Sequence, residues 1–354
     1  MAFVVDICYN SSGGRVATLV LNRNSISVKL ESDHLVIHRH LPQEDEPEME
    51  TLPVRDVDRV LVVGAPAVTM PVLARFLDRD IPCVFLTKGG RWRGLLQSGI
   101  SYNVARRMRQ YDAFRDPGAC LPLARETVVA KLQNARRVIQ RLCSNRSLPM
   151  VTGEHAAGLA AGMAQARNAD SVDELRGVEG IGSFHYFRLL ARFFPGDFPF
   201  GTRSRRPPLD PANALLSFAY TCLMNECLSA IALHGLDSAL GFMHQDRERS
   251  PSLALDLMEP FRPAFADLFV LNLLNHGRFD PDRDFQRDPD TGGWYLDEGG
   301  RQVFLPACEA ALTRPFLPRG ESTHVTFRQA IDRQVVSLVR FLEDGTPPRF
   351  FRLA

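Results

Sequence analysis

The first hundred residues alternate between short apolar runs and polar breaks, a pattern typical of β-strands. Five runs rich in β-branched and apolar residues are Val16–Leu21, Ser25–Leu30, His34–His38, Val57–Val63 and Cys83–Leu86. Between the last two runs, Val68–Asp78 has the apolar spacing of a short helix. The pattern therefore predicts a small β-rich region at the start of the chain.

From about Asn103 onward, apolar residues recur at spacings of three and four, which predicts helices. The periodic segments are Ala105–Phe114, Ala124–Leu142, Leu253–Leu274 and Phe327–Glu343. Pro260 and Pro263 fall inside the third segment, where we expect a kink or a break.

Capping signals mark two further helices. Ser171 and Glu174 form the S-x-x-E pattern of a capping box. Asp210 is a candidate N-cap, Pro211 fits the first helical position, and Gly235 fits the left-handed position after the last turn. We therefore expect helices that begin after Ser171 and after Asp210.

The elements predict an α+β protein. We expect a small N-terminal β-rich domain over residues 1–98, followed by a larger, mainly α-helical domain over 99–354. Within the second domain, Trp294–Leu296 and Gln302–Leu305 flank Asp297-Glu298-Gly299-Gly300, a pattern that favours a β-hairpin.

Composition narrows the class of protein only slightly. Apolar residues make up 45% of the chain and charged residues 23%, as in ordinary globular proteins. No apolar run reaches the roughly 18 residues that span a bilayer, so we expect a cytoplasmic protein without a membrane segment. The net charge of +1 does not by itself argue for a nucleic-acid partner.

Four polar residues of the helical region are candidates for catalysis. Asp256 and Glu259 are three residues apart in an apolar helix, so their carboxylates can converge on one face. Glu179 is close to Gly177 and Gly180, where close approach of another backbone is expected, and His244 follows a loop. Carboxylates with one imidazole suit Mg²⁺ or Mn²⁺.

Each of these residues also has a simpler interpretation. Glu179 fits a solvent-facing position, and His244 fits a loop histidine held by hydrogen bonds. Asp256 and Glu259 fit one polar stripe on a helix. The spacing alone leaves a shared metal site and these alternatives open.

Arginines cluster near the candidate ligands. Arg203, Arg205 and Arg206 precede the helix that starts after Asp210, and Arg247 and Arg249 follow His244. Because arginine binds phosphate in a bidentate manner, we expect contacts with a DNA backbone. A solvated basic surface is the alternative.

Four stretches in series resemble the CRISPR-associated endonuclease and integrase family. They are Arg176–Gly180 with Tyr186-Phe187, Arg205–Tyr220, Gly235–Asp237 with Gly241–His244, and Pro251–Pro263. The resemblance is weaker over residues 1–50 and 277–324.

The resemblance implies roles for particular residues. Glu179, His244 and Glu259 match the family's metal ligands, and Asp256 matches a further acidic position of the active site. It also implies a Mg²⁺- or Mn²⁺-dependent integrase that acts on double-stranded and branched DNA. Such proteins join the 3′-hydroxyl ends of spacer fragments into a CRISPR repeat, as homodimers assembled with a small ferredoxin-like subunit. We expect the N-terminal domain to form the dimer.

Two other functions remain open. A metal-dependent nuclease could use the same site on branched or single-stranded DNA, with water as the nucleophile. A non-catalytic DNA-binding scaffold would be expected to lack one of the ligands, and all four positions are occupied by acidic or imidazole side chains.

Overall fold

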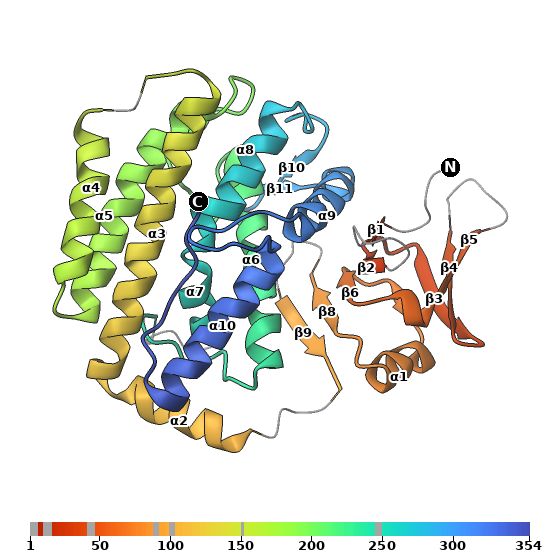
Figure 1. The fold of residues 1–354 in the computed structure, drawn as a ribbon. Coiled ribbons are helices and arrows are strands. Elements are labelled where there is room, and N and C mark those ends of the chain that lie inside the picture. Colours follow the sequence, from red (N-terminus) through yellow and green to blue (C-terminus); the bar gives the residue numbers. More distant parts are fainter. Residues whose placement is uncertain are drawn as a thin grey trace. The chain divides into compact units, whose positions relative to one another are not determined.

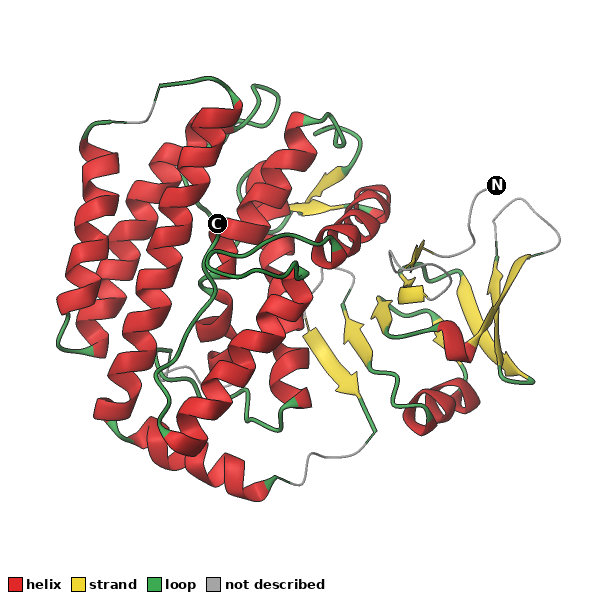
Figure 2. Ribbon diagram, viewed as in Figure 1, coloured by secondary structure: helices red, strands yellow, loops and turns green. Residues whose placement is uncertain are grey.

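The chain forms two compact units with different secondary structure. The structure, a computed structural model, describes residues 6–9, 16–40, 47–87, 92–98, 103–149, 152–244 and 250–354. The first unit comprises Met1–Ile100, Phe279–Arg287 and Tyr295–Arg314, and the second comprises Ser101–Arg278, Asp288–Trp294 and Pro315–Ala354. The strands gather in the N-terminal part and helices dominate the rest (Figures 1 and 2), which confirms the expected fold class.

Two sheets make up most of the first unit. The first, in spatial order, contains β1 (Asp6–Tyr9), β2 (Val16–Leu21), β6 (Val60–Val63), β8 (Cys83–Leu86) and β9 (Trp92–Leu96). The second contains β5 (Glu48–Pro53), β4 (His34–Arg39), β3 (Ile26–Glu31) and β7 (Ala67–Val68). The β2–β6, β6–β8 and β3–β7 pairs are parallel, and the other pairs are antiparallel.

The core of this unit lies among both sheets and the helix α1 (Met70–Asp78). Leu19 and Leu21 of β2, Ile37 of β4 and Phe76 of α1 are all fully buried members of one cluster. A short 3₁₀ turn at Val54–Asp56 follows β5. The β-branched runs in the sequence therefore predicted the strands because both faces of the central strands are apolar.

The predicted hairpin at Asp297–Gly300 is wrong. Asp297 caps a helix instead, since its Oδ1 accepts a hydrogen bond of 2.7 Å from Gly300 N, and α9 (Glu298–Thr313) follows. A Cβ at Gly300 would lie 2.4 Å from the carbonyl oxygen of Asp284, so this glycine permits close packing rather than a turn. The strand β11 (Trp294–Leu296) pairs with β10 (Phe285–Arg287).

The helix α9 belongs to the unit that holds the N-terminal strands. The Thr18 hydroxyl of β2 donates a 2.6 Å hydrogen bond to Glu309 of α9, and both residues are buried. A division of the chain at residues 98 and 99 places α9 in the helical part, whereas the structure places it in the first unit. Sequence continuity is thus a poor guide to the composition of this unit.

The second unit is helical. Its α-helices are α2 (Val104–Arg115), α3 (Pro117–Asn145), α4 (Glu154–Asn168), α5 (Val172–Leu190), α6 (Pro211–Leu233), α7 (Ser252–Met258), α8 (Leu268–Asn275) and α10 (Phe327–Asp344). Helices α3, α4 and α5 lie side by side (Figure 1), and a 3₁₀ turn, Ala191–Phe193, extends α5.

Helix α6 is a long, apolar helix of the unit. Asp210 caps it by accepting a 2.7 Å hydrogen bond from Asn213 N, Pro211 is its first residue, and Gly235 follows with φ of 69°, as predicted. Its length and composition would suffice to cross a membrane, but 72% of its apolar window is buried in the structure. The burial is that of a core helix.

A π-helical segment separates α7 from α8. It spans Arg262–Asp267 and begins just after Pro260, which confirms the interruption expected at the two prolines. The wider π turn places Arg262 and Asp267 on the wall of one pocket with Tyr220 of α6. Such turns are frequent at functional sites.

Candidate active site

Glu179 lies on α5, whose N-terminus is fixed by Ser171. The Ser171 hydroxyl accepts from Glu174 N at 3.2 Å, while the Glu174 carboxylate accepts from Asp170 N instead of closing the capping box on Ser171. A Cβ added at Gly177 or Gly180 would meet no atom within 4 Å. The expected close backbone approach at these two glycines is therefore wrong.

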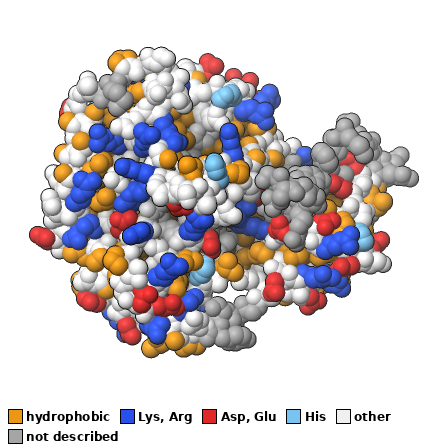
Figure 3. All heavy atoms as spheres, in the orientation of Figure 1, with side chains coloured by type: hydrophobic (Ala, Val, Ile, Leu, Met, Phe, Trp, Pro, Cys, Tyr) orange, Lys and Arg blue, Asp and Glu red, His pale blue; other side chains and the backbone are white. Residues whose placement is uncertain are grey.

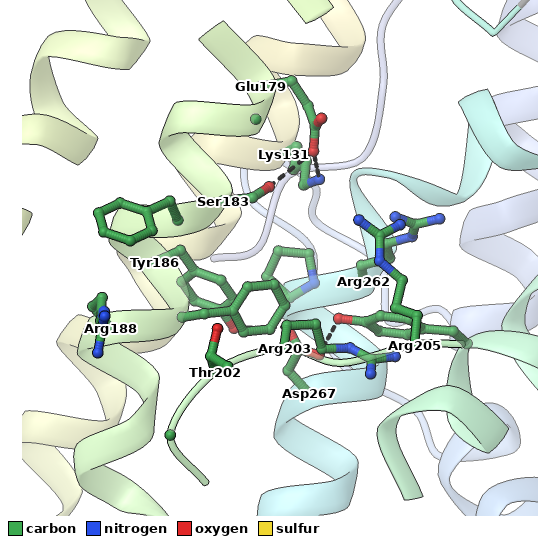
Figure 4. A pocket seen from close by; sticks show the side chains of 16 residues that line it. Lys131, Glu179, Ser183, Tyr186, Arg188, Thr202, Arg203, Arg205, Arg262 and Asp267 are labelled. Atoms are coloured by element: carbon green, nitrogen blue, oxygen red, sulfur yellow. Dashed lines mark hydrogen bonds and ion pairs between the residues drawn. The ribbon is translucent and has the colours of Figure 1, made fainter. Parts of the chain in front are cut away.

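Glu179 and Glu259 share one buried ammonium group. Lys131 of α3 forms an ion pair with Glu179 Oε1, and its Nζ lies 2.6 Å from Glu259 Oε2. Arg262 binds the other oxygen of Glu259 at 2.9 Å, and the Ser183 hydroxyl donates to Glu179 Oε1 at 2.8 Å. The two carboxylates, from different helical segments, thus converge on a single positive charge (Figure 4 shows the Glu179 side).

The charge of Lys131 keeps Glu179 ionised. Burial alone raises the pKa of this carboxyl, but the Lys131 charge and the hydrogen bonds from Lys131 and Ser183 outweigh burial and lower it to about 2. Glu179 is therefore a carboxylate throughout the neutral range. The same two carboxylates raise the pKa of Lys131 against the opposing effect of its burial.

His244 is held by Asp256. The Asp256 side chain is fully buried and accepts from the backbone N–H groups of Phe242, Met243 and His244, at 2.7, 2.9 and 3.1 Å. Its Oδ1 also lies 2.5 Å from His244 Nδ1. With Nδ1 donating to the carboxylate, the Nε2 lone pair is available to a metal ion or a proton. Asp256 is thus a positioning residue for the imidazole.

The structure divides the four candidate residues into two groups. Glu179 and Glu259 both contact Lys131, and His244 contacts Asp256, but among the described residues no three acidic, imidazole or thiol side chains surround one point. Arg176, one turn before Glu179 on α5, donates from Nε to the Met243 carbonyl at 2.6 Å. The loop that carries His244 is therefore anchored to the helix that carries Glu179.

The carboxylate pair fits a divalent cation. Oε2 of the buried Glu259 receives no aligned hydrogen bond from the described part of the chain, although the Lys131 ammonium is 2.6 Å away. The two carboxylates therefore already surround a cation, and oxygen ligands are those that Mg²⁺ and Mn²⁺ prefer. A divalent ion on both carboxylates requires Lys131 to move.

A basic pocket of about 240 Å³ opens beside Glu179. Arg188 lies on one side of it, and Arg205 and Arg262 lie on the other (Figure 4). Its basic lining residues are Lys131, Arg188, Arg203, Arg205 and Arg262, and its acidic ones are Glu179 and Asp267. Basic side chains are also spread across the face of the helical unit seen in Figure 3. The pocket is suited to an anion.

The arginines predicted to bind DNA differ in their availability. Arg203 donates to Asn213 and Ser217 at 2.8 and 2.9 Å, so its guanidinium stabilises the start of α6. Arg205 is exposed and forms no hydrogen bond or ion pair within the described residues, and Arg206 is exposed as well. Arg247 and Arg249 lie outside the described residues.

Comparison with known proteins identifies the family. Residues 19–310 match the family described as CRISPR associated protein Cas1. The chain belongs to the Cas1 family. The CRISPR-associated endonuclease Cas1 3 of Thermus thermophilus is 35% identical over 343 residues, which cover 96% of this chain and 97% of that protein. A Cas4 exonuclease and Cas1 endonuclease fusion of Geobacter sulfurreducens is 34% identical over 94% of this chain, which spans 60% of the fusion.

Solved structures share the Cas1 fold. A casposase bound to its integration product has a TM-score of 0.82 at 24% identity, and the match covers 95% of this chain and 93% of the casposase. A Cas6-RT-Cas1–Cas2 complex contains a chain with a TM-score of 0.74 at 21% identity, which covers 98% of this chain and 36% of that one. The names of the curated relatives place this Cas1-family chain in the class of CRISPR-associated endonucleases.

The sequence did not single out Lys131 or the pocket. Lys131 is one of three lysines in an arginine-rich chain, and it lies among apolar residues of α3. A rare lysine in an apolar stretch was the one sequence feature that indicated a buried charge. Tyr186 and Tyr220 donate to Asp267 at 2.9 and 2.7 Å, a buried network that no local spacing indicates.

We predict that Asp256→Asn disorders the His244 loop. An amide nitrogen in place of one oxygen faces backbone donors, so unfolding free energy falls by about 1 to 3 kcal/mol. Loss of an orienting partner lowers activity by about 10- to 100-fold. Urea unfolding and the rate of DNA processing test this, with the exposed Asp197→Asn as the control. If Asp256→Asn and Asp197→Asn processed DNA at equal rates, Asp256 would not position the imidazole for the reaction.

We predict that Asp267 makes stability fall as pH rises from about 4 to 6. Burial raises the pKa of Asp267 to about 6, although the two tyrosines lower it. The folded state therefore retains a proton that the unfolded state loses near pH 4, and this stabilisation disappears as pH passes 6. The amide of Asp267→Asn does not titrate, so the variant lacks this pH-dependent contribution to stability. Relative to the parent, its unfolding free energy should improve by about 2 to 3 kcal/mol between pH 4 and 7.

The measurement is urea unfolding of both proteins at each pH, because groups shared by both cancel in the difference. A difference that stays constant with pH would show that Asp267 is ionised in the folded state throughout.

Proposed function

We propose that this Cas1-family protein is a divalent-metal-dependent DNA integrase that inserts spacers into a CRISPR array. One observation carries the proposal. The carboxylates of Glu179 and Glu259, from separate helical segments, converge on the Lys131 ammonium beside a basic pocket. The casposase relative in fold, described as bound to its integration product, supports DNA joining as the reaction.

The residues have distinct proposed roles. Glu179 and Glu259 would hold Mg²⁺ or Mn²⁺ through carboxylate oxygens once Lys131 moves aside. The loop that carries His244 would have to bring Nε2 to the same ion, because the described residues do not group these three side chains. When bound, the ion polarises the phosphodiester and stabilises charge at the attacking and leaving oxygens. Arg205 and Arg206 bind backbone phosphate, and we extend this role to Arg247 and Arg249 from their place in the sequence.

The proposed reaction is a transesterification. The 3′-hydroxyl of a foreign DNA fragment attacks a phosphodiester at the edge of a repeat, a new P–O bond forms, and the bond to the original 3′-oxygen breaks. The proton of the hydroxyl leaves with the released strand end. Because one phosphodiester replaces another, no external energy source is required.

Product analysis tests the reaction. A labelled fragment is incubated with a repeat-containing plasmid and Mn²⁺ or Mg²⁺, and label joined to the plasmid is expected only with metal. A chelator should abolish joining. Hydrolysed ends without joined ones would instead establish the alternative, a nuclease that acts on branched or single-stranded DNA with water as the nucleophile at the same carboxylates.

We also propose the assembly in which the enzyme works. A homodimer formed through the N-terminal domain would bind a small ferredoxin-like subunit, and the fold relative described as a Cas1–Cas2 complex supports such a partner. Light scattering of the protein with and without that subunit measures this. A monomer that never associates with it would contradict the assembly.

A further inference from the structure

Phe184 of α5 is an exposed aromatic ring at the rim of the basic pocket. Half of its surface is solvent-accessible (52%), and it lines the same pocket as Glu179 and Arg188. Exposing a phenyl ring costs solvation free energy that burial would recover, so an exposed ring in a polar pocket favours an apolar or aromatic ligand group.

The ring is held in place by its neighbours. His155 of α4 and His185 of α5 contact it with ring centroids 5.8 and 5.4 Å apart and interplanar angles of 78° and 66°. The two histidines are themselves joined, with their Nδ1 atoms 3.0 Å apart. Among the described residues no aromatic ring stacks parallel to Phe184, although the Arg188 guanidinium lies over the ring.

Charge around the ring indicates the rest of the ligand. The Arg188 guanidinium lies 5.5 Å from the Phe184 centroid, and Arg205 lines the same pocket without an ion pair among the described residues. Five basic residues line the pocket against two acidic ones. The centres of protein–protein interfaces are depleted of charge, whereas a basic groove with an aromatic platform is typical of single-stranded nucleic acid sites.

We infer that Phe184 stacks an unpaired nucleobase of the strand whose phosphate lies at Glu179 and Glu259. Phe184 is five residues beyond Glu179, about 7.5 Å along the helix axis. Both side chains line the same pocket, so a base on Phe184 would lie close to a phosphate held at Glu179. Phe184 is thus a positioning residue that selects strands unpaired near the reacting phosphate, an inference that rests on the proposed function.

The test is DNA binding without metal. A hairpin duplex with a single-stranded tail carrying 2-aminopurine is titrated with the full chain in chelator, and fluorescence reports stacking and affinity. The parent should quench the probe, and Phe184→Ala should bind the tailed hairpin about 5- to 150-fold more weakly. Binding of the same hairpin with a blunt end should change less than about twofold, because phosphate contacts remain.

Two further variants make the outcome specific. Phe184→Trp retains a stacking surface and should preserve quenching. Ile181→Ala removes an equally exposed apolar side chain from the same helix, outside the pocket lining, and should match the parent. The melting temperature of each variant reports its folding.

Several results would overturn the inference. They are equal losses on tailed and blunt hairpins, no loss for Phe184→Ala, no tail binding by the parent, or a change in oligomeric state, which would mark the ring as a protein contact. Because no metal and no joining are involved, quenching that depends on Phe184 would stand even if strand transfer failed. If Phe184→Ala joined DNA and bound the tailed hairpin as the parent does, the stacking role of Phe184 would be rejected while the proposed function would stand.

Discussion

His244→Ala is expected to abolish strand transfer while DNA binding remains. Asp256 orients the imidazole at 2.5 Å and leaves Nε2 free of that contact, so the substitution would remove the proposed metal ligand. Groups of this kind contribute on the order of 10²- to 10⁴-fold to rate. The measurement is the joining rate under single-turnover conditions, beside the dissociation constant for the same DNA.

A matched histidine separates this effect from general damage. His276 is exposed at the end of α8, and His276→Ala should join DNA at the parental rate. The affinity of His244→Ala for DNA should stay within about twofold of the parent, since arginines supply the phosphate contacts. Full strand transfer by His244→Ala would eliminate the role of this residue.

Lys131→Met is expected to destabilise the metal-free protein strongly. The substitution leaves the buried carboxylate of Glu259 and the partly buried carboxylate of Glu179 without the ammonium between them, and breaking a buried ion pair costs about 3 to 5 kcal/mol. A divalent ion should restore part of the loss, because it binds the folded state and replaces the missing charge. Thermal unfolding in chelator and in Mn²⁺ measures both effects.

The control for this experiment is Lys29→Met, the same substitution at an exposed position of β3. It should leave the melting temperature and its response to Mn²⁺ unchanged. If Lys131→Met melted like the parent in chelator, the ammonium would not hold the two carboxylates together. If Mn²⁺ then stabilised the variant no more than the parent, the carboxylates would not form the metal site.

Local signals predicted the helices where the backbone itself requires particular residues. Asp210, Pro211 and Gly235 marked both ends of α6 because capping and the left-handed position depend on single residue types. The same reasoning failed at Asp297–Gly300, where an N-cap and a turn use the same residues. Only the close contact of Gly300 with Asp284 distinguishes them, and that contact is tertiary.

Only part of the site was predicted, because some of its contacts also depend on tertiary packing. The resemblance selected Glu179, His244, Asp256 and Glu259, and the structure pairs them on Lys131 and within the His244 loop. Lys131 itself was missed because it meets Glu179 across 48 residues of sequence, through packing of α3 on α5. The Asp267 network escaped prediction because it needs the π turn to place the carboxylate against two tyrosines.

The inclusion of α9 in the N-terminal unit constrains how the protein can be made. The hydrogen bond from Thr18 to Glu309 joins residues separated by 291 positions, so the first unit is incomplete until most of the chain has left the ribosome. A fragment that ends at Ile100 lacks this helix altogether. Co-expression of that fragment with a peptide spanning Phe279–Arg314 is the natural route to an isolated, soluble N-terminal unit.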